Sequence, residues 1–167
     1  MIKAAILSIN GRQEPETSEY GQIVKDMIKE IDGKEVYYNA VADEFGKIQE
    51  ELFNLTEKGT ADIIFTIGGT GFKKKDITPE ATMAVIEKET PGIAELMRRK
   101  MSMVVPEAIL LRGRAGIRKS TLIINLPGDT TTIKECLKAL LPVIPRGVEV
   151  LKQIPTRHKL LKLWDQG

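Results

Sequence analysis

The sequence predicts a three-layer α/β/α fold with a mostly parallel β-sheet and one short antiparallel strand. Short apolar segments of strand length alternate with amphipathic segments of helix length from the first residues onward. This alternation is typical of a parallel sheet whose two faces are covered by helices. The chain has 167 residues, of which 42% are hydrophobic and 29% are charged, so it can form one domain with a substantial core.

The first half of the chain contains three predicted strands. They cover Lys3–Ile9, Glu35–Val41 and Ala61–Ile67, and their aliphatic and aromatic residues suit strands buried between helices. Two amphipathic helices separate them, each followed by a glycine that suits a helix end. The first covers 18–31. The second runs to about residue 58, and we expect Asp43 to be its N-cap.

The second half continues the alternation. Thr78-Pro79-Glu80 predicts a helix start in which the threonine caps, and this helix should reach about Glu89. Another helix follows over 93–103. Two short strands, 115–118 and 121–126, are joined by a tight turn and are predicted to be antiparallel. The last long helix covers 130–141. We assign 1–153 to the domain and 154–167 to a basic C-terminal arm.

In parallel sheets, ligands bind beyond the carboxyl ends of the strands. The sequence places polar or glycine-rich segments at four such ends, which we expect to meet at one edge of the sheet. These segments are Ser8–Arg12, Asp43–Glu44, Gly68–Asp76 and Asn125–Asp129.

The glycine-rich loop after the third strand carries the most information. Gly68, Gly69 and Gly71 surround Thr70 and allow the backbone N–H groups to approach an anion closely. Three lysines, 73–75, add positive potential. The loop lacks the spacing of a Walker A motif and the third glycine of a dinucleotide fingerprint. A plain glycine turn beside solvated lysines is the alternative.

Asp43 and Asp76 follow two successive predicted strands. A carboxylate pair at such a position suits Mg²⁺, which prefers oxygen ligands and retains several waters. The alternatives are a helix N-cap for Asp43 and, for Asp76, a turn residue neutralised by Lys74 and Lys75. For Asp129, a helix N-cap is the favoured interpretation, although the helix end beside it could also hold a phosphate.

Several other residues have simpler interpretations. Arg112, Arg114, Arg118 and Lys119 form a basic cluster that either meets an anionic substrate or is a solvated face. Cys136 lies on an apolar helical stripe, so we expect a buried, inert thiol. His158 is expected at the surface of the arm, and Trp164 is expected to anchor that arm.

Composition excludes several classes of protein. No apolar run approaches the length of a membrane span, and no signal peptide precedes the first strand. A single cysteine excludes an internal disulfide framework, so we expect a cytoplasmic protein. The segment 145–167 holds five basic and two acidic residues, a weak signal for nucleic-acid binding. We therefore expect neither a nucleic-acid partner nor a membrane partner.

The segment from Thr66 to Thr82, TIGGTGFKKKDITPEAT, resembles the signature loop and following helix of the molybdopterin adenylyltransferases of the MogA/MoaB type. The similarity extends from the first strand to about residue 150, and the long loop signature is far more specific than GGTG alone. Shorter matches are Pro91-Gly92 with Glu95, Ser102, Pro106, Ala108-Ile109-Leu110, Gly116-Ile117-Arg118 and Asn125-Leu126-Pro127-Gly128.

The resemblance implies a homo-oligomer, trimer or hexamer, that binds molybdopterin. It implies transfer of AMP from Mg-ATP to the terminal phosphate of molybdopterin, with release of pyrophosphate. Asp43 and Asp76 correspond to the two functional aspartates of the family and would hold Mg²⁺. The implied binding residues are Gly68, Gly69, Thr70, Gly71, Ser102, Asn125, Pro127 and Gly128.

Two positions depart from the pattern of the family. Asn10-Gly11-Arg12 replaces a common Ser-Asp-Arg, and Asp129 replaces a common serine or amide. These departures motivate a second hypothesis, a non-catalytic molybdopterin carrier or scaffold. A third is a nucleotide-processing enzyme similar to the CinA-like proteins. Those proteins usually carry a further catalytic domain, for which 167 residues leave no room.

Overall fold

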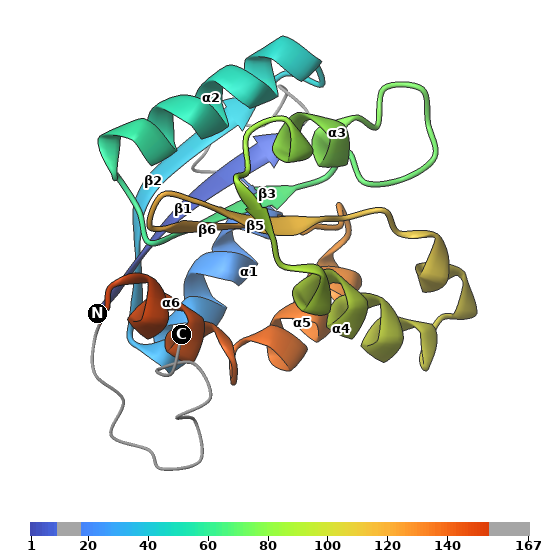
Figure 1. The fold of residues 1–167 in the computed structure, drawn as a ribbon. Coiled ribbons are helices and arrows are strands. Elements are labelled where there is room, and N and C mark those ends of the chain that lie inside the picture. Colours follow the sequence, from blue (N-terminus) through green and yellow to red (C-terminus); the bar gives the residue numbers. More distant parts are fainter. Residues whose placement is uncertain (10–17, 154–167) are drawn as a thin grey trace.

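A computed structural model describes residues 1–9 and 18–153, and these residues form a sheet with helices on both faces (Figure 1). The strands are β1 (Ile2–Ile9), β2 (Gly33–Val41), β3 (Ile63–Ile67), β4 (Lys88–Glu89), β5 (Ala115–Arg118) and β6 (Thr121–Leu126). The α-helices are α1 (Glu19–Met27), α2 (Phe45–Lys58), α3 (Thr78–Met83), α4 (Pro91–Ser102), α5 (Thr130–Leu140) and α6 (Ile144–Leu151). Two 3₁₀ helices are η2 (Ile28–Ile31) and η3 (Pro106–Leu110).

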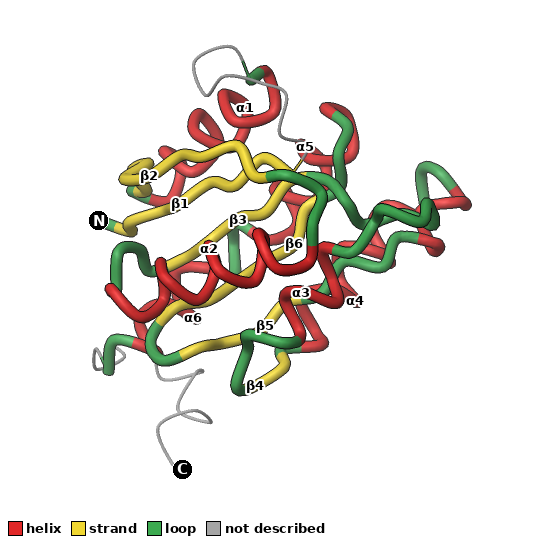
Figure 2. Tube along the Cα trace, turned by 90° about the horizontal axis from the view of Figure 1, so that it is seen from above, coloured by secondary structure: helices red, strands yellow, loops and turns green. Residues whose placement is uncertain are grey.

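The six strands lie in the order β2-β1-β3-β6-β5-β4, which Figure 2 shows from above. The pairs β1–β2, β1–β3 and β3–β6 are parallel, whereas β5 is antiparallel to both β4 and β6. The predicted fold class is therefore confirmed. Parallel pairing brings the carboxyl ends of β1, β2, β3 and β6 to one edge, at the right of Figure 1.

The core consists of two layers, one on each face of the sheet. Phe65 and Ile124 pack in the layer that contains residues of α1, α4, α5 and α6, whereas Ile64 and Ile123 pack in the layer that contains residues of α2 and α3. All four side chains are fully buried. Burial on both faces explains why β3 and β6 are continuous apolar runs rather than alternating patterns.

Two predicted helices have different bounds in the structure. The helix expected over 78–89 is wrong in its second half, because α3 ends at Met83 and Lys88–Glu89 pairs with β5 instead. The N–H of Glu87 already donates to Ile117 O at 2.8 Å. The helix expected over 18–31 changes to the 3₁₀ helix η2 after Met27.

Two predicted N-caps are also wrong. Glu44, not Asp43, holds the N-cap position of α2, and its side chain makes no capping hydrogen bond. Thr78 is the first residue of α3 rather than its cap, and its hydroxyl donates to Gly68 O at 3.0 Å. Asp129 does cap α5, as predicted. Helix α6, with Pro145 in its first turn, is an element that the sequence analysis did not assign.

Some expectations fall outside the described residues, namely those on Asn10-Gly11-Arg12, on His158 and Trp164, and on the arm 154–167. Within residues 1–9 and 18–153, no helix combines the length and apolarity that crossing a bilayer requires.

Candidate functional site

The glycine-rich loop begins where β3 ends. Gly68 and Gly69 have φ values of +98° and +68°, in the region that favours glycine. A Cβ on Gly69 would lie 2.2 Å from Oγ1 of Thr78. The hydroxyl of Thr78 donates to Gly68 O, so the start of α3 packs directly on the loop. Both conformation and space therefore require glycine at position 69.

The loop after β6 packs against the glycine-rich loop. The N–H of Gly68 donates to Leu126 O at 3.0 Å. A Cβ on Gly128 would lie 3.2 Å from Cα of Gly68. Pro127, between these residues, is buried. The structure thus brings together the segments 68–71 and 126–128, which the sequence analysis expected to meet.

Lys75, the residue before Asp76 in the chain, forms an ion pair with Asp43. Its ammonium lies 3.8 Å from Oδ2 of Asp43, although Lys75 belongs to the loop after β3 and Asp43 follows β2. Asp76 accepts the backbone N–H of Lys73 at 2.9 Å through Oδ2. The expected alternative of a turn residue is confirmed for Asp76, whose N–H also donates to Lys73 O at 2.9 Å; its carboxylate is held by this backbone turn and not by the side chains of Lys74 and Lys75.

Asn125 is directed into the protein interior. Its Nδ2 donates to the hydroxyls of Thr66 and Thr82, each at 2.9 Å. Its Oδ1 accepts the N–H of Arg114 at 3.0 Å. The residue is only 1% exposed, so this amide connects β3, α3 and the entry to β5. The Asn125 amide therefore uses these hydrogen bonds to hold protein segments together at the edge of the site.

Ser102 and Asp129 use their side chains locally. The hydroxyl of Ser102, the last residue of α4, donates to Arg99 O at 3.1 Å. The carboxylate of Asp129 accepts the N–H groups of Thr131 and Thr132. Asp129 therefore occupies the donors that a phosphate at the start of α5 would need.

The predicted basic cluster is paired with glutamates rather than available to an anionic substrate. Arg114 pairs with Glu89, and Arg118 and Lys119 both pair with Glu57. Arg112 differs from the others because it contacts the glycine-rich loop in addition to Glu80. The sequence analysis did not predict the contact of Arg112 with the loop. Gly71 lies 41 residues earlier in the chain, and no motif near Arg112 indicates this partner.

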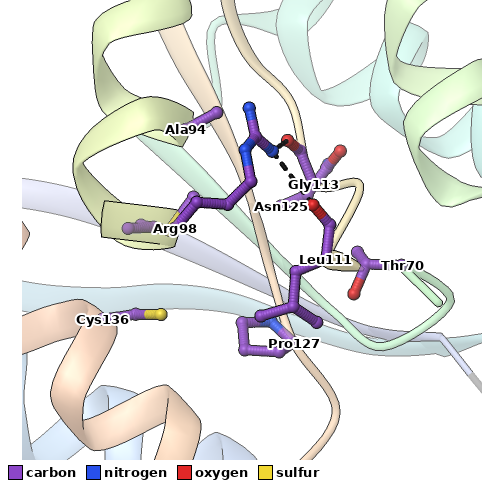
Figure 3. A pocket seen from close by; sticks show the side chains of 9 residues that line it. Thr70, Ala94, Arg98, Leu111, Gly113, Asn125, Pro127 and Cys136 are labelled. Atoms are coloured by element: carbon purple, nitrogen blue, oxygen red, sulfur yellow. Dashed lines mark hydrogen bonds between the residues drawn. The ribbon is translucent and has the colours of Figure 1, made fainter. Parts of the chain in front are cut away.

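A small cavity lies behind the glycine-rich loop, beside α4 (Figure 3). Its wall includes Thr70, Arg98, Asn125, Pro127 and Cys136. Burial raises the pKa of the Cys136 thiol to about 12, and the charges of Asp129 and Glu135 act in the same direction. The thiol is buried, which confirms that part of the expectation, and a raised pKa favours the protonated, unreactive form.

A magnesium ion that keeps water and substrate oxygens in its shell would need few protein carboxylates. Within the described part of the chain, no group of three or more His, Cys, Asp or Glu side chains is arranged to hold a metal. Asp43 and Asp76 are the two carboxylates that the sequence analysis assigned to that ion. The side chain of Asp43 is 22% exposed and already faces a cation, the ammonium of Lys75. The carboxylate of Asp76 accepts one hydrogen bond from the described residues, at Oδ2.

The chain is similar to proteins of molybdenum cofactor synthesis. A curated protein of Helicobacter pylori (strain ATCC 700392 / 26695), named molybdopterin adenylyltransferase, is 44% identical over 133 residues, which cover 78% of this chain and 76% of that protein. The crystal structure of the molybdopterin biosynthesis enzyme MoaB from Thermus thermophilus has a TM-score of 0.83 and 34% identity, covering 93% of this chain and 99% of the other.

The structure of the molybdopterin biosynthesis Mog protein from Mycobacterium ulcerans has a TM-score of 0.81 and 32% identity, covering 93% of this chain and all of the other. The family model described as a probable molybdopterin binding domain matches residues 9–146. That match includes the segments after β2, β3 and β6 that build the site. The chain therefore belongs to the molybdopterin-binding domain family, among the MogA/MoaB-type proteins of molybdenum cofactor biosynthesis.

Proposed function

We propose that the protein is a molybdopterin adenylyltransferase. In the reaction, a terminal phosphate oxygen of molybdopterin attacks the α-phosphorus of ATP. The bond from this phosphorus to the bridging oxygen breaks, and pyrophosphate leaves. The observation that carries the proposal is the meeting of three strand-end segments at one edge, where the loop that holds the glycines and Asp76 contacts Leu126 after β6 and Asp43 after β2.

The residues have distinct roles in this proposal. The backbone N–H groups of Gly69, Thr70 and Gly71 orient phosphate oxygens, and the lysines of the loop add positive potential. Asp43 and Asp76 hold Mg²⁺, whose charge offsets that of the polyphosphate. No protein nucleophile is required, because adenylyl transfer depends on holding two anionic substrates in line.

Lys73 and Lys74 add positive charge to the glycine-rich loop, and their exposure suits an anionic ligand and the alternative of solvated lysines equally. Both are exposed, and within residues 1–9 and 18–153 neither forms an ion pair. The glutamates that neutralise Arg112, Arg114 and Lys119 lie elsewhere. This leaves two uncompensated cations on the loop that carries the phosphate-binding glycines.

The test is an assay of the purified protein with molybdopterin, ATP and Mg²⁺. We expect adenylylated molybdopterin by mass spectrometry and pyrophosphate in equal amount, with both abolished by EDTA. Tight molybdopterin binding without product would overturn the proposal and favour the alternative of a carrier or scaffold. Omission of molybdopterin controls for simple ATP hydrolysis, which would release ADP and phosphate instead.

We also propose a cytoplasmic homo-oligomer, a trimer or hexamer, without nucleic-acid or membrane partners. An exposed apolar segment beside η3 supports self-association, since Met103, Val104 and Ile109 are 77%, 66% and 61% exposed. Large exposed apolar patches mark interaction surfaces. Light scattering during size exclusion should give three or six chains, and Met103→Glu should reduce that number. A monomeric wild-type protein would contradict this.

A further inference from the structure

Arg112 connects the segment before β5 to the glycine-rich loop. Its backbone N–H donates to Thr70 O at 3.0 Å. In the guanidinium, Nε donates to Gly71 O at 2.8 Å and Nη2 donates to Asp76 O at 2.6 Å. The remaining nitrogen, Nη1, forms an ion pair with Glu80 in α3. One side chain therefore contacts the start of the lysine-bearing segment, its end and the helix that follows.

The geometry suits arginine in particular. A guanidinium is planar and presents its donors in a rigid fork, whereas a lysine ammonium is a single point of charge on a flexible stem. Gly71 and Asp76 bracket Phe72, Lys73, Lys74 and Lys75, all four of which are exposed. The internal hydrogen bonds of this segment join Lys73 to Asp76. The guanidinium of Arg112 joins both ends of the segment to the body of the protein, and the ion pair of Lys75 with Asp43 attaches it at a further point.

The backbone on both sides of Arg112 is held by Arg98 of α4. Nη1 of Arg98 donates to Leu111 O at 3.1 Å and to Gly113 O at 3.0 Å, on either side of Arg112, as Figure 3 shows. Gly113 is buried, and a Cβ there would lie 3.1 Å from Asn125 O. The backbone that carries Arg112 is thus held between α4 and β6. The contacts form a continuous connection from α4 to Asp76.

We infer that Arg112 is a positioning residue, which holds the glycine-rich loop and Asp76 in the conformation that binds the polyphosphate substrate. The identity of the ligand in this inference rests on the proposed function, whereas the positioning of the loop rests on the contacts of Arg112. Without the fork, the loop would occupy its binding conformation for a smaller fraction of the time. The apparent dissociation constant then rises by the inverse of that fraction, while substrate binding restores the conformation. The expected effect is therefore on KM more than on kcat.

Hydrogen exchange tests the structural half of the inference without any substrate. In Arg112→Met, we expect the amides of Asp76 and Thr78, which donate to Lys73 O and Gly69 O, to exchange about tenfold faster. The amide of Gly68, bonded to Leu126 O, should change less than twofold and is the internal reference. Arg114→Met is the matched control, because it removes an arginine–glutamate pair two residues away without touching the loop.

Kinetics test the functional half. For Arg112→Met we expect KM for Mg-ATP or for molybdopterin to rise about tenfold with kcat within twofold, and Arg114→Met to behave as wild type. Arg112→Lys should fall between wild type and Arg112→Met, and it keeps the charge if the methionine variant does not fold. Unchanged loop exchange in both Arg112 variants, or faster exchange with unchanged KM, would overturn the inference.

The two proposals fail in different ways. If the wild-type protein forms no adenylylated molybdopterin, the proposed function fails. The role of Arg112 is then still decided by the hydrogen-exchange rates of the loop amides and by the affinity for pyrophosphate. Pyrophosphate should then bind Arg112→Met about tenfold more weakly than Arg114→Met. Equal affinities of these two variants would overturn the positioning role whether or not the enzyme is active.

Discussion

The ammonium of Lys75 lies 3.8 Å from Oδ2 of Asp43, which joins the loop after β3 to the end of β2 across the strand between them. Lys75 is 64% exposed and Asp43 is 22% exposed. An exposed pair of this kind contributes about 1 kcal/mol or less to stability. Its importance is geometric, because it shows that Asp43 faces the loop that contains Asp76.

In the proposed magnesium site, Lys75 would compete with the divalent cation for the carboxylate of Asp43. We predict that Lys75→Met binds Mn²⁺, used alone as a spectroscopic substitute for Mg²⁺, about threefold more tightly than wild type. Electron paramagnetic resonance titration gives the affinity. Lys74→Met is the control, because it removes a positive charge one residue away, on a lysine that forms no ion pair within the described residues. It should change the Mn²⁺ affinity less. Equal changes in both variants would contradict a specific competition at Asp43.

Gly69→Ala should distort the glycine-rich loop. The new Cβ would meet Thr78 Oγ1 at 2.2 Å, and the φ of +68° disfavours alanine. We expect a loss of about 2 kcal/mol in unfolding free energy and a loss of pyrophosphate binding. Gly46→Ala is the control, because that glycine lies in α2 with nothing within 4 Å of its Cβ position. It should stabilise the protein by about 0.5 to 1 kcal/mol in urea unfolding.

Asn125→Ala should act mainly on stability. The substitution leaves the hydroxyls of Thr66 and Thr82 and the N–H of Arg114 without their partner in the interior. We predict a loss of about 3 kcal/mol in chemical unfolding, in the range for buried groups left unsatisfied. If stability falls by less than about 1 kcal/mol while molybdopterin binding is lost, Asn125 is a ligand contact and not a structural residue.

Tyr37 predicts a pH dependence at the outer edge of the sheet. Its hydroxyl donates to Glu51, and this hydrogen bond, followed by burial and the carboxylate charge, raises the pKa of Tyr37 to about 12. The folded state therefore binds this proton more tightly than the unfolded state, whose tyrosine pKa is about 10. The contribution is fully present below pH 10 and is lost as the pH rises toward 12.

The comparison of wild type with Tyr37→Phe isolates this contribution, because the other tyrosines are common to both proteins. Wild type should lose more stability than Tyr37→Phe between pH 10 and pH 12 in urea unfolding. Parallel pH profiles for the two proteins would show that the hydrogen bond to Glu51 does not shift this titration.

The sequence predicts the parallel part of the fold well because its determinants are local. β3 and β6 are apolar runs bounded by turn residues, and burial on both faces imposes that pattern. The helix predicted over 78–89 was wrong because β4 exists only through its pairing with β5, a contact between residues that are far apart in sequence. Local propensity does not contain that information.

The same distinction applies to the site. The approach of the glycine-rich loop to the end of β2 was predictable because the ends of parallel strands meet at one edge, and the pairing of Lys75 with Asp43 confirms that approach; the metal-binding role of Asp43 and Asp76 stays a prediction. The role of Arg112 was not found, since nothing near position 112 indicates that its side chain contacts Gly71 and Asp76. A guanidinium that binds carbonyl groups leaves no motif in the sequence.

The most direct test of the central claim is AMP transfer by variants of the two carboxylates. Asp43→Asn and Asp76→Asn remove charge with little change in shape, and the asparagine at 76 can still accept the N–H of Lys73. Glu44→Gln is the control, because it removes an exposed carboxylate next to Asp43 that makes no capping bond. We predict that each aspartate variant loses about 100-fold in kcat with an unchanged melting temperature, and that Glu44→Gln is active. Full activity in both aspartate variants would contradict a shared magnesium site at this edge of the sheet.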